Sequence, residues 1–174
     1  KQGAAISAAS LAARIQQRLD QVKKQYEDFL LKHPKHARAH LAYASFLGDI
    51  GEETTSREHA EKARDLDPSN PAAWNNLGNL YGHRGPVKEA FVCYEKAISL
   101  NPNVATYYQN FATTVYLFRK DAKEHYNIDE QEVFTKALAL YEKALKLDPK
   151  NFILASDWAQ SYYGIKPPRN DDAL

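Results

Sequence analysis

PAAWNNLGNLYGHRGPVKEAFVCYEKAISLNPNV, residues 71–104, is the stretch that decides the fold. Trp74, Leu77 and Tyr81 recur at spacings of three and four residues, which places them on one face of a helix. Gly85 and a proline follow, and a glycine at the end of a periodic run with proline next marks a boundary between helices. The stretch therefore predicts two helices joined by a tight turn.

Eight positions of this stretch agree together with the pattern W-x2-L-G-x2-Y…A-x3-F…P. They are Trp74, Leu77, Gly78, Tyr81, Ala90, Tyr94, Ala97 and Pro102, with Tyr94 where phenylalanine is commoner. The stretch resembles a tetratricopeptide repeat, a helix–turn–helix unit with a period of about 34 residues. Because one such pair cannot bury its apolar faces alone, the resemblance implies an all-α, right-handed α-solenoid of stacked repeats.

The rest of the sequence follows the same period less closely, and we interpret it as a single array. Pro34, Pro68 and Pro102 are 34 residues apart, which fixes the register. The expected parts are a long N-terminal helix in residues 1–36, a degenerate repeat in 37–70, the clear repeat in 71–104, a repeat with an insert in 105–151 and a partial repeat in 152–174.

The repeat in residues 105–151 is longer than the period. Pro102 and Pro149 are 47 residues apart, so 13 residues have been added near positions 119–129, without a glycine or proline. Asp129 and Glu132 have the spacing of a capping box at the start of the second helix. We therefore expect both helices of this repeat to be lengthened and to project as a helical hairpin.

Both ends of the sequence suggest a piece of a longer protein. It begins at Lys1 and contains no methionine, so we expect a trimmed or processed chain. The sequence is compatible with two locations, the cytoplasm and a membrane to which an anchor upstream of Lys1 would tether the chain. Pro167 and Pro168 lead into residues 171–174, which we expect to begin a further helix of a continuing array.

Composition narrows the class of partner. The 174 residues are 44% hydrophobic, and 23 basic against 22 acidic side chains give a net charge of +1. The nearly balanced charge argues against binding to the phosphate backbone of a nucleic acid. The 11 tyrosines do not indicate a surface for stacking bases either, because most of them occupy core positions of the repeats.

Cys93 is the single cysteine, so no internal disulfide forms. No apolar run approaches the ~20 residues of a transmembrane segment.

The sequence lacks the common motifs of catalysis and cofactor binding. It contains neither G-x-G-x-x-G, nor G-x-x-x-x-G-K-[ST], nor H-E-x-x-H, and we predict no catalytic residue and no cofactor. His33, His36 and His40 lie close together, with His40 at the position of Trp74. No cysteine lies near them to complete a metal site, so we predict packing and solvent roles and no bound metal.

The resemblance also implies where a ligand would bind, because the first helix of each repeat lines the concave face in this family. The predicted groove residues are Asn75, Asn76, Asn79, His83, Gln109, Asn110, Thr113 and Tyr116. Their amides carry both donors and acceptors, which suits the backbone of an extended peptide. Asn76 and Asn110 share a repeat position and are expected side by side. Ordinary solvated polar surface is the alternative.

Some tetratricopeptide repeats hold a C-terminal carboxylate with a clamp of lysine, arginine and asparagine. Asn79 and Asn110 match the amide members of that clamp. Its basic positions hold Asn75, Ile153 and Asp157, so we do not expect a carboxylate clamp.

These observations favour a non-catalytic protein–protein interaction scaffold that binds a peptide or partner segment in the concave groove. Three alternatives stay open. The chain could tether a filament or membrane to another protein, as kinesin light chains do with their repeats. It could form a homo-oligomer through the N-terminal helix, where residues 15–29 have coiled-coil spacing. It could also be an accessory repeat region of a larger protein.

Overall fold

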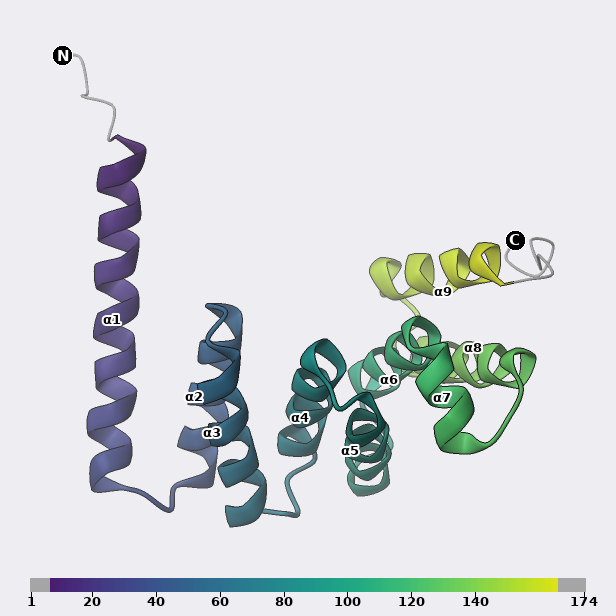
Figure 1. The fold of residues 1–174 in the computed structure, drawn as a ribbon, viewed down its shortest axis with the longest axis horizontal. Coiled ribbons are helices and arrows are strands. Elements are labelled where there is room, and N and C mark those ends of the chain that lie inside the picture. The colour runs from purple at the N-terminus through teal and green to yellow at the C-terminus, as the bar shows by residue number, and fades with distance from the viewer. Residues whose placement is uncertain (1–6, 166–174) are drawn as a thin grey trace. The chain divides into compact units, whose positions relative to one another are not determined.

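The computed structural model describes residues 7–165, and within this range every regular element is a helix (Figure 1). The all-α prediction is confirmed. No helix in the described range is both long and apolar enough to cross a bilayer. The helix expected to begin at residues 171–174 lies outside the described residues, as do the first six residues of the N-terminal segment.

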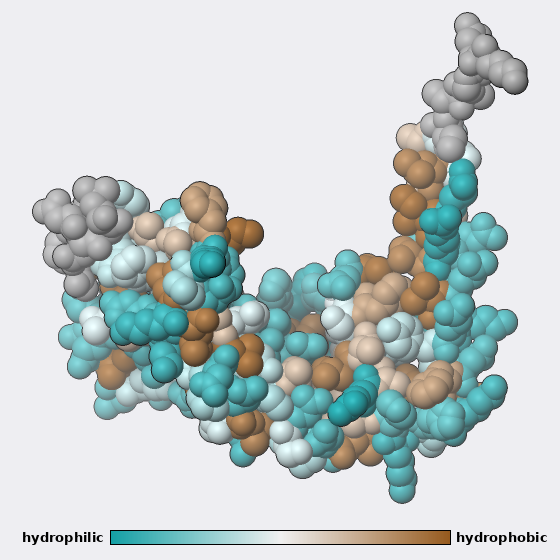
Figure 2. Space-filling view, turned by 180° about the vertical axis from the view of Figure 1, so that it is seen from behind, coloured by the Kyte–Doolittle hydropathy of each residue, from teal (hydrophilic) through white to brown (hydrophobic). Residues whose placement is uncertain are grey.

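The chain divides into two compact units, Lys1–Leu66 and Asp67–Leu174. The first unit contains α1 (Ala8–Lys32), α2 (Ala37–Asp49) and α3 (Glu53–Leu66). Only the C-terminal half of α1 packs on α2, where Tyr26 stacks on Tyr43 with ring centroids 4.9 Å apart and Leu30 is buried. In the other half, Leu11 and Ile15 remain 51% and 50% exposed. Figure 2 shows the hydrophobic side chains gathered along one side of α1.

The second unit contains the clear repeat and the repeat with the insert. Its helices are α4 (Pro71–Arg84), α5 (Val87–Leu100), α6 (Ala105–Leu117), α7 (Arg119–Tyr126), α8 (Glu130–Leu147) and α9 (Phe152–Gly164). Antiparallel pairs form between α4 and α5 and between α6 and α8, and α9 packs on α8.

Local sequence explains the boundaries of α4. Asn70 caps its start by accepting the backbone N–H of Ala72 at 3.0 Å, with Pro71 at the first helical position. Gly85 ends it with φ of 77°, a conformation that glycine adopts without steric cost.

Close packing of α4 on α5 depends on Gly78. A Cβ at this position would lie 2.6 Å from Cε1 of Tyr94, which is buried between the two helices. Tyr94 also stacks on Phe111 of α6 at 5.6 Å, so one ring joins two successive repeats. The repeat glycine is therefore a packing requirement set by this tyrosine.

A recurring hydrogen bond closes three of the turns between repeats. His40 Nε2, Trp74 Nε1 and Tyr108 Oη lie 3.0, 2.9 and 3.1 Å from the backbone oxygens of Pro34, Pro68 and Pro102, each six residues earlier. The three side chains differ in shape, but each has an N–H or O–H group that can donate to the carbonyl oxygen. The turn carbonyl lies outside the helical ladder and needs such a donor.

The insert differs from its prediction. The expected projecting hairpin with two lengthened helices is wrong, because α6 has 13 residues, the same number as α2, and only α8 is lengthened, to 18. The added residues form the separate helix α7, which packs against α5, α6 and α8. The capping box is confirmed: Asp129 N–H donates to Glu132 at 2.8 Å, and Glu132 N–H donates to Asp129 at 2.9 Å.

The reason for this difference is an apolar face within the charged insert. Phe118, Ala122 and Tyr126 are spaced by four residues, and Ala122 is completely buried against the core of the unit. Tyr126 Oη donates to Glu95 of α5 at 2.8 Å, and the ammonium of Lys136 lies 4.1 Å from the centre of its ring. These contacts fold α7 back onto the helix pairs.

The contact between Gly78 and Tyr94 can be tested by adding one methyl group. Gly78→Ala should lower the free energy of unfolding by about 1–3 kcal/mol, because the new Cβ overlaps the Tyr94 ring. Urea unfolding followed by circular dichroism measures this change.

Gly82→Ala is the matched control on the same helix. Its Cβ would lie 3.5 Å from Thr114, an ordinary contact, and alanine stabilises helices by up to about 1 kcal/mol relative to glycine. Equal effects of the two substitutions would contradict the assigned packing.

Candidate functional site

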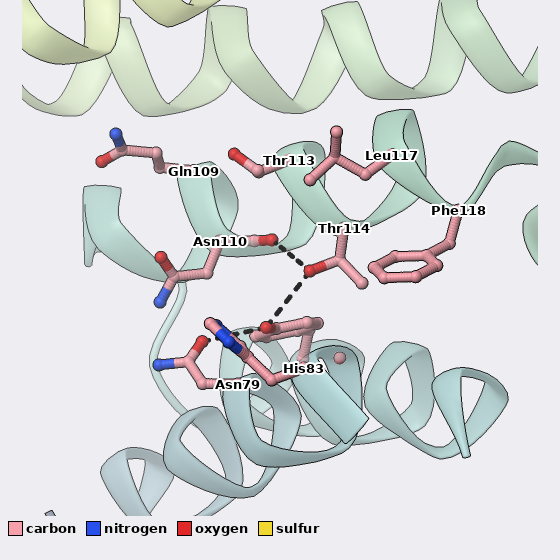
Figure 3. A pocket seen from close by; sticks show the side chains of 10 residues that line it. Asn79, His83, Gln109, Asn110, Thr113, Thr114, Leu117 and Phe118 are labelled. Atoms are coloured by element: carbon pink, nitrogen blue, oxygen red, sulfur yellow. Dashed lines mark hydrogen bonds between the residues drawn. The ribbon is translucent and has the colours of Figure 1, made fainter. Parts of the chain in front are cut away.

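A cleft of about 330 Å³ lies between α4 and α6 in the second unit (Figure 3). It is lined by Asn79, Gly82, His83, Tyr94, Gln109, Asn110, Thr113, Thr114, Leu117 and Phe118. Five of the eight predicted groove residues are in this lining. Asn75, Asn76 and Tyr116 are the three that are not.

Helical spacing brings the lining side chains together. On α4, Asn79 and His83 are four residues apart and share a face, next to the buried Gly78. On α6, Gln109 and Thr113 are also four apart, beside the buried Phe111. In α4 and α6, the first helices of their repeats, one row of side chains is buried and the adjoining row lines the cleft.

The amide of Asn79 is oriented by a buried phenol. Tyr94 Oη donates to Asn79 Oδ1 at 2.9 Å, and burial raises the pKa of Tyr94 to about 12, so this hydroxyl keeps its proton at neutral pH. This bond turns the Asn79 oxygen toward Tyr94, so the amide nitrogen lies on the opposite side of the amide group (Figure 3). Asn79 lines the cleft, and its amide nitrogen carries two N–H donors.

The amide of Asn110 is oriented by Asn75. Asn110 Nδ2 donates to Asn75 Oδ1 at 3.1 Å, and Asn75 is buried, with 7% of its surface exposed. Asn75 thus positions Asn110 and does not itself face the cleft. The partner of Asn110 is thus Asn75, and Asn76, which was expected beside Asn110, is not part of the cleft lining. Asn110 keeps an oxygen acceptor and a second N–H.

Thr114 and Tyr94 connect the two amides beneath the cleft. The Thr114 hydroxyl lies 2.8 Å from the Asn110 backbone oxygen and 3.3 Å from Tyr94 Oη. It has one hydrogen for these two acceptors, so the shorter contact is the stronger bond. Tyr94, Thr114 and Phe118 were not predicted as groove residues. Their repeat positions indicate core packing, and the structure shows that they also line the cleft.

A second polar group continues the cleft toward α9. Gln109 Nε2 donates to Asp157 Oδ2 at 3.1 Å, and Thr113 Oγ1 lies 2.8 Å from the hydroxyl of Tyr141. Tyr116 lies elsewhere: its ring packs near Phe134, and a side chain at Gly164 would overlap its hydroxyl.

The two walls of the cleft differ in character. His83 is exposed at one wall, and Leu117 is 60% exposed on the other, next to Phe118. The lining contains no lysine, arginine, aspartate or glutamate. The cleft therefore offers neutral hydrogen-bonding groups with an apolar edge.

Comparison with known proteins gives the family. A tetratricopeptide-repeat family model matches residues 71–104, and a second one matches residues 132–151. The chain contains tetratricopeptide repeats. The first match coincides with α4 and α5, and the second lies mainly on α8, the second helix of the repeat with the insert.

Two curated relatives of this chain are photosystem I assembly proteins named Ycf3. The protein from Rippkaea orientalis is 27% identical over 84 residues, which cover 48% of this chain and 49% of the relative. The protein from Acaryochloris marina is 25% identical over 87 residues, covering 49% and 52%. The chain spans about half the length of the curated relatives it matches.

Solved structures share the fold. A crystal structure of MamA has a TM-score of 0.72 at 21% identity, covering 97% of this chain and 90% of MamA. The first tetratricopeptide-repeat domain of Spaghetti (RPAP3), bound to the HSP90 peptide SRMEEVD, has a TM-score of 0.61 at 18% identity, covering 74% and 91%. These likenesses establish the architecture.

The three histidines considered for metal binding occupy different surroundings in the first unit. His33 and His36 are exposed beside Phe29, whereas His40 is buried and lies 2.8 Å from His59, measured between their Nδ1 atoms. No group of three or more potential ligands gathers in the described part of the chain.

The His40–His59 pair requires one arrangement of protons. The oxygen of Pro34 can only accept, so His40 Nε2 carries a hydrogen, and in the neutral ring its Nδ1 accepts from His59 Nδ1–H. Burial lowers the pKa of both rings, and the charge of Lys62 adds to this effect. The Pro34 bond opposes the shift at His40, while Glu58 and Glu27 oppose it at His59.

These shifts predict that the first unit loses stability in acid. A histidine whose pKa is lowered on folding binds protons more readily in the unfolded chain, where its pKa is about 6.5. The stability contribution is therefore complete above about pH 6.5 and is lost as the pH falls toward the folded-state pKa values. The urea midpoint should drop between about pH 7.5 and about pH 5.5, as measured by hydrogen exchange or circular dichroism.

His59→Gln should reduce this acid sensitivity, because the glutamine amide can donate to His40 and does not titrate. The control is His83→Gln, which removes an exposed histidine from the other unit and should leave the pH dependence unchanged. If both variants behave alike, the pair is not the acid-sensitive element.

Proposed function

We propose that this chain is a non-catalytic scaffold that binds an extended segment of a partner protein in the cleft between α4 and α6. The observation that carries the proposal is the fixed orientation of two amides. Tyr94 occupies the oxygen of Asn79 and leaves its N–H donors, while Asn75 occupies one N–H of Asn110 and leaves its oxygen. Each residue of a peptide backbone offers one C=O and one N–H, which this donor and acceptor match.

The cost of ligand binding also favours this cleft. Hydrogen bonds that hold both amides before a ligand arrives reduce the side-chain entropy lost on binding. The lining has no charged side chain that a neutral backbone would have to desolvate.

The names of similar proteins agree with a role in protein assembly. The Ycf3 relatives are named photosystem I assembly proteins, and the Spaghetti domain is bound to an HSP90 peptide. We do not expect this chain to hold a C-terminal carboxylate, because the basic clamp positions contain Asn75, Ile153 and Asp157.

Self-association through α1 is the second candidate function. Leu11 and Ile15 are half exposed on the same side of α1 as Tyr26, which packs on α2. Two such helices could cover each other's apolar stripe. Sedimentation velocity decides this alternative, since a protein that stays monomeric at every concentration does not use α1 in this way.

The groove proposal predicts that Asn79→Ala combined with Asn110→Ala weakens binding of a peptide selected from an unbiased library. Each lost hydrogen bond should cost about 0.5–1.5 kcal/mol, so the dissociation constant should rise roughly 5- to 150-fold. Fluorescence anisotropy titration measures this change, and thermal melting verifies that the variant is folded.

The matched control is Gln21→Ala, which removes an exposed amide from α1 in the other unit. It should leave affinity unchanged. Equal affinity of the double variant and the native chain would exclude the cleft as the binding site.

A further inference from the structure

Formal charge is distributed unevenly among the helices of the second unit. The three first helices, α4, α6 and α9, contain 14, 13 and 13 residues, yet they carry only Arg84 and Asp157 as charged side chains. By contrast, α5 carries Lys88, Glu89, Glu95 and Lys96, and α8 carries Glu130, Glu132, Lys136, Glu142, Lys143 and Lys146. The face built from first helices is therefore nearly neutral, and each charge on it has a large local effect.

Asp157 lies beside the cleft. Its Oδ2 accepts the amide of Gln109, which lines the cleft, at 3.1 Å. The carboxylate is half-buried, and its charge adds to burial in raising the pKa of Tyr141, whose hydroxyl meets Thr113 of the lining. Asp157 thus places a negative charge at the α9 end of the cleft, where the lining itself contributes none.

We infer that the bound segment carries a lysine or arginine side chain that pairs with Asp157, and an apolar side chain that packs against Leu117. This inference rests on the proposed binding of a peptide in the cleft. A partner with a free C-terminal carboxylate or acidic side chains at this place would meet like charge and no cationic lining residue.

The geometry of α6 sets the spacing of the two side chains. Gln109, which marks the Asp157 end, and Leu117 are eight residues apart on one helix, or about 12 Å at 1.5 Å per residue. An extended peptide rises about 3.3 Å per residue, and residues four apart lie on the same side of it. The basic and apolar side chains are therefore about four residues apart, with three residues between them.

A library of capped peptides of about 12 residues, long enough to cross the cleft when extended, is the probe. Capping both ends removes terminal charges, so any charge preference comes from side chains. The native chain should enrich peptides with lysine or arginine four residues from a leucine, isoleucine or phenylalanine. Enrichment of acidic peptides, or no preference for charge, would overturn the inference.

Asp157→Asn isolates the charge, because asparagine can still accept the Gln109 amide. It should weaken binding of a selected basic peptide by about two- to fivefold, the range for a solvent-exposed ion pair. Asp157→Lys should reverse the enrichment toward acidic peptides. Glu142→Gln removes the same charge from an exposed position on α8 and should change nothing.

The two proposals fail in different ways. Peptides that need Asn79 and Asn110 but bind Asp157→Asn with native affinity overturn only the charge preference. Peptides that bind the Asn79→Ala/Asn110→Ala variant with native affinity, or a library that yields no binder, overturn both.

Discussion

The contact on which three successive turns of the array depend is a hydrogen bond from a side chain to the carbonyl of a proline six residues earlier. Proline ends the preceding helix because it cannot continue the ladder, and its own carbonyl is then left outside regular structure. His40, Trp74 and Tyr108 each supply the missing donor from the first turn of the next helix. Each bond ties the start of a helix to the turn that comes before it.

This contact also explains why a degenerate repeat can fold like a clear one. His40 replaces the residue that most clearly marks the repeat, yet it keeps the donor at the same place. The smaller ring leaves room for His59, and the two imidazoles then share a hydrogen bond. Histidine at this repeat position keeps the hydrogen bond of the turn. It also forms a titratable pair with His59, which the tryptophan at position 74 cannot do.

The periodic residues allowed most of the helices to be predicted, because glycine and proline act locally and apolar spacing fixes the buried face. Asn79, His83, Gln109, Asn110 and Thr113 were also predictable as cleft residues from their repeat positions. Their partners were not, since the bonds of Asn79 to Tyr94 and of Asn110 to Asn75 depend on side-chain packing between helices. The insert was misjudged because its charged residues hid the spacing of Phe118, Ala122 and Tyr126.

The position of α7 has a mechanical consequence. A stack of helix pairs bends most easily where one pair meets the next, because each pair contacts only its neighbours. In this chain α7 contacts α5 on one side of such a joint and both α6 and α8 on the other, and Tyr126 fastens it to Glu95. Contacts of α7 with both pairs limit bending between the α4–α5 pair and the α6–α8 pair, whose first helices form the walls of the cleft.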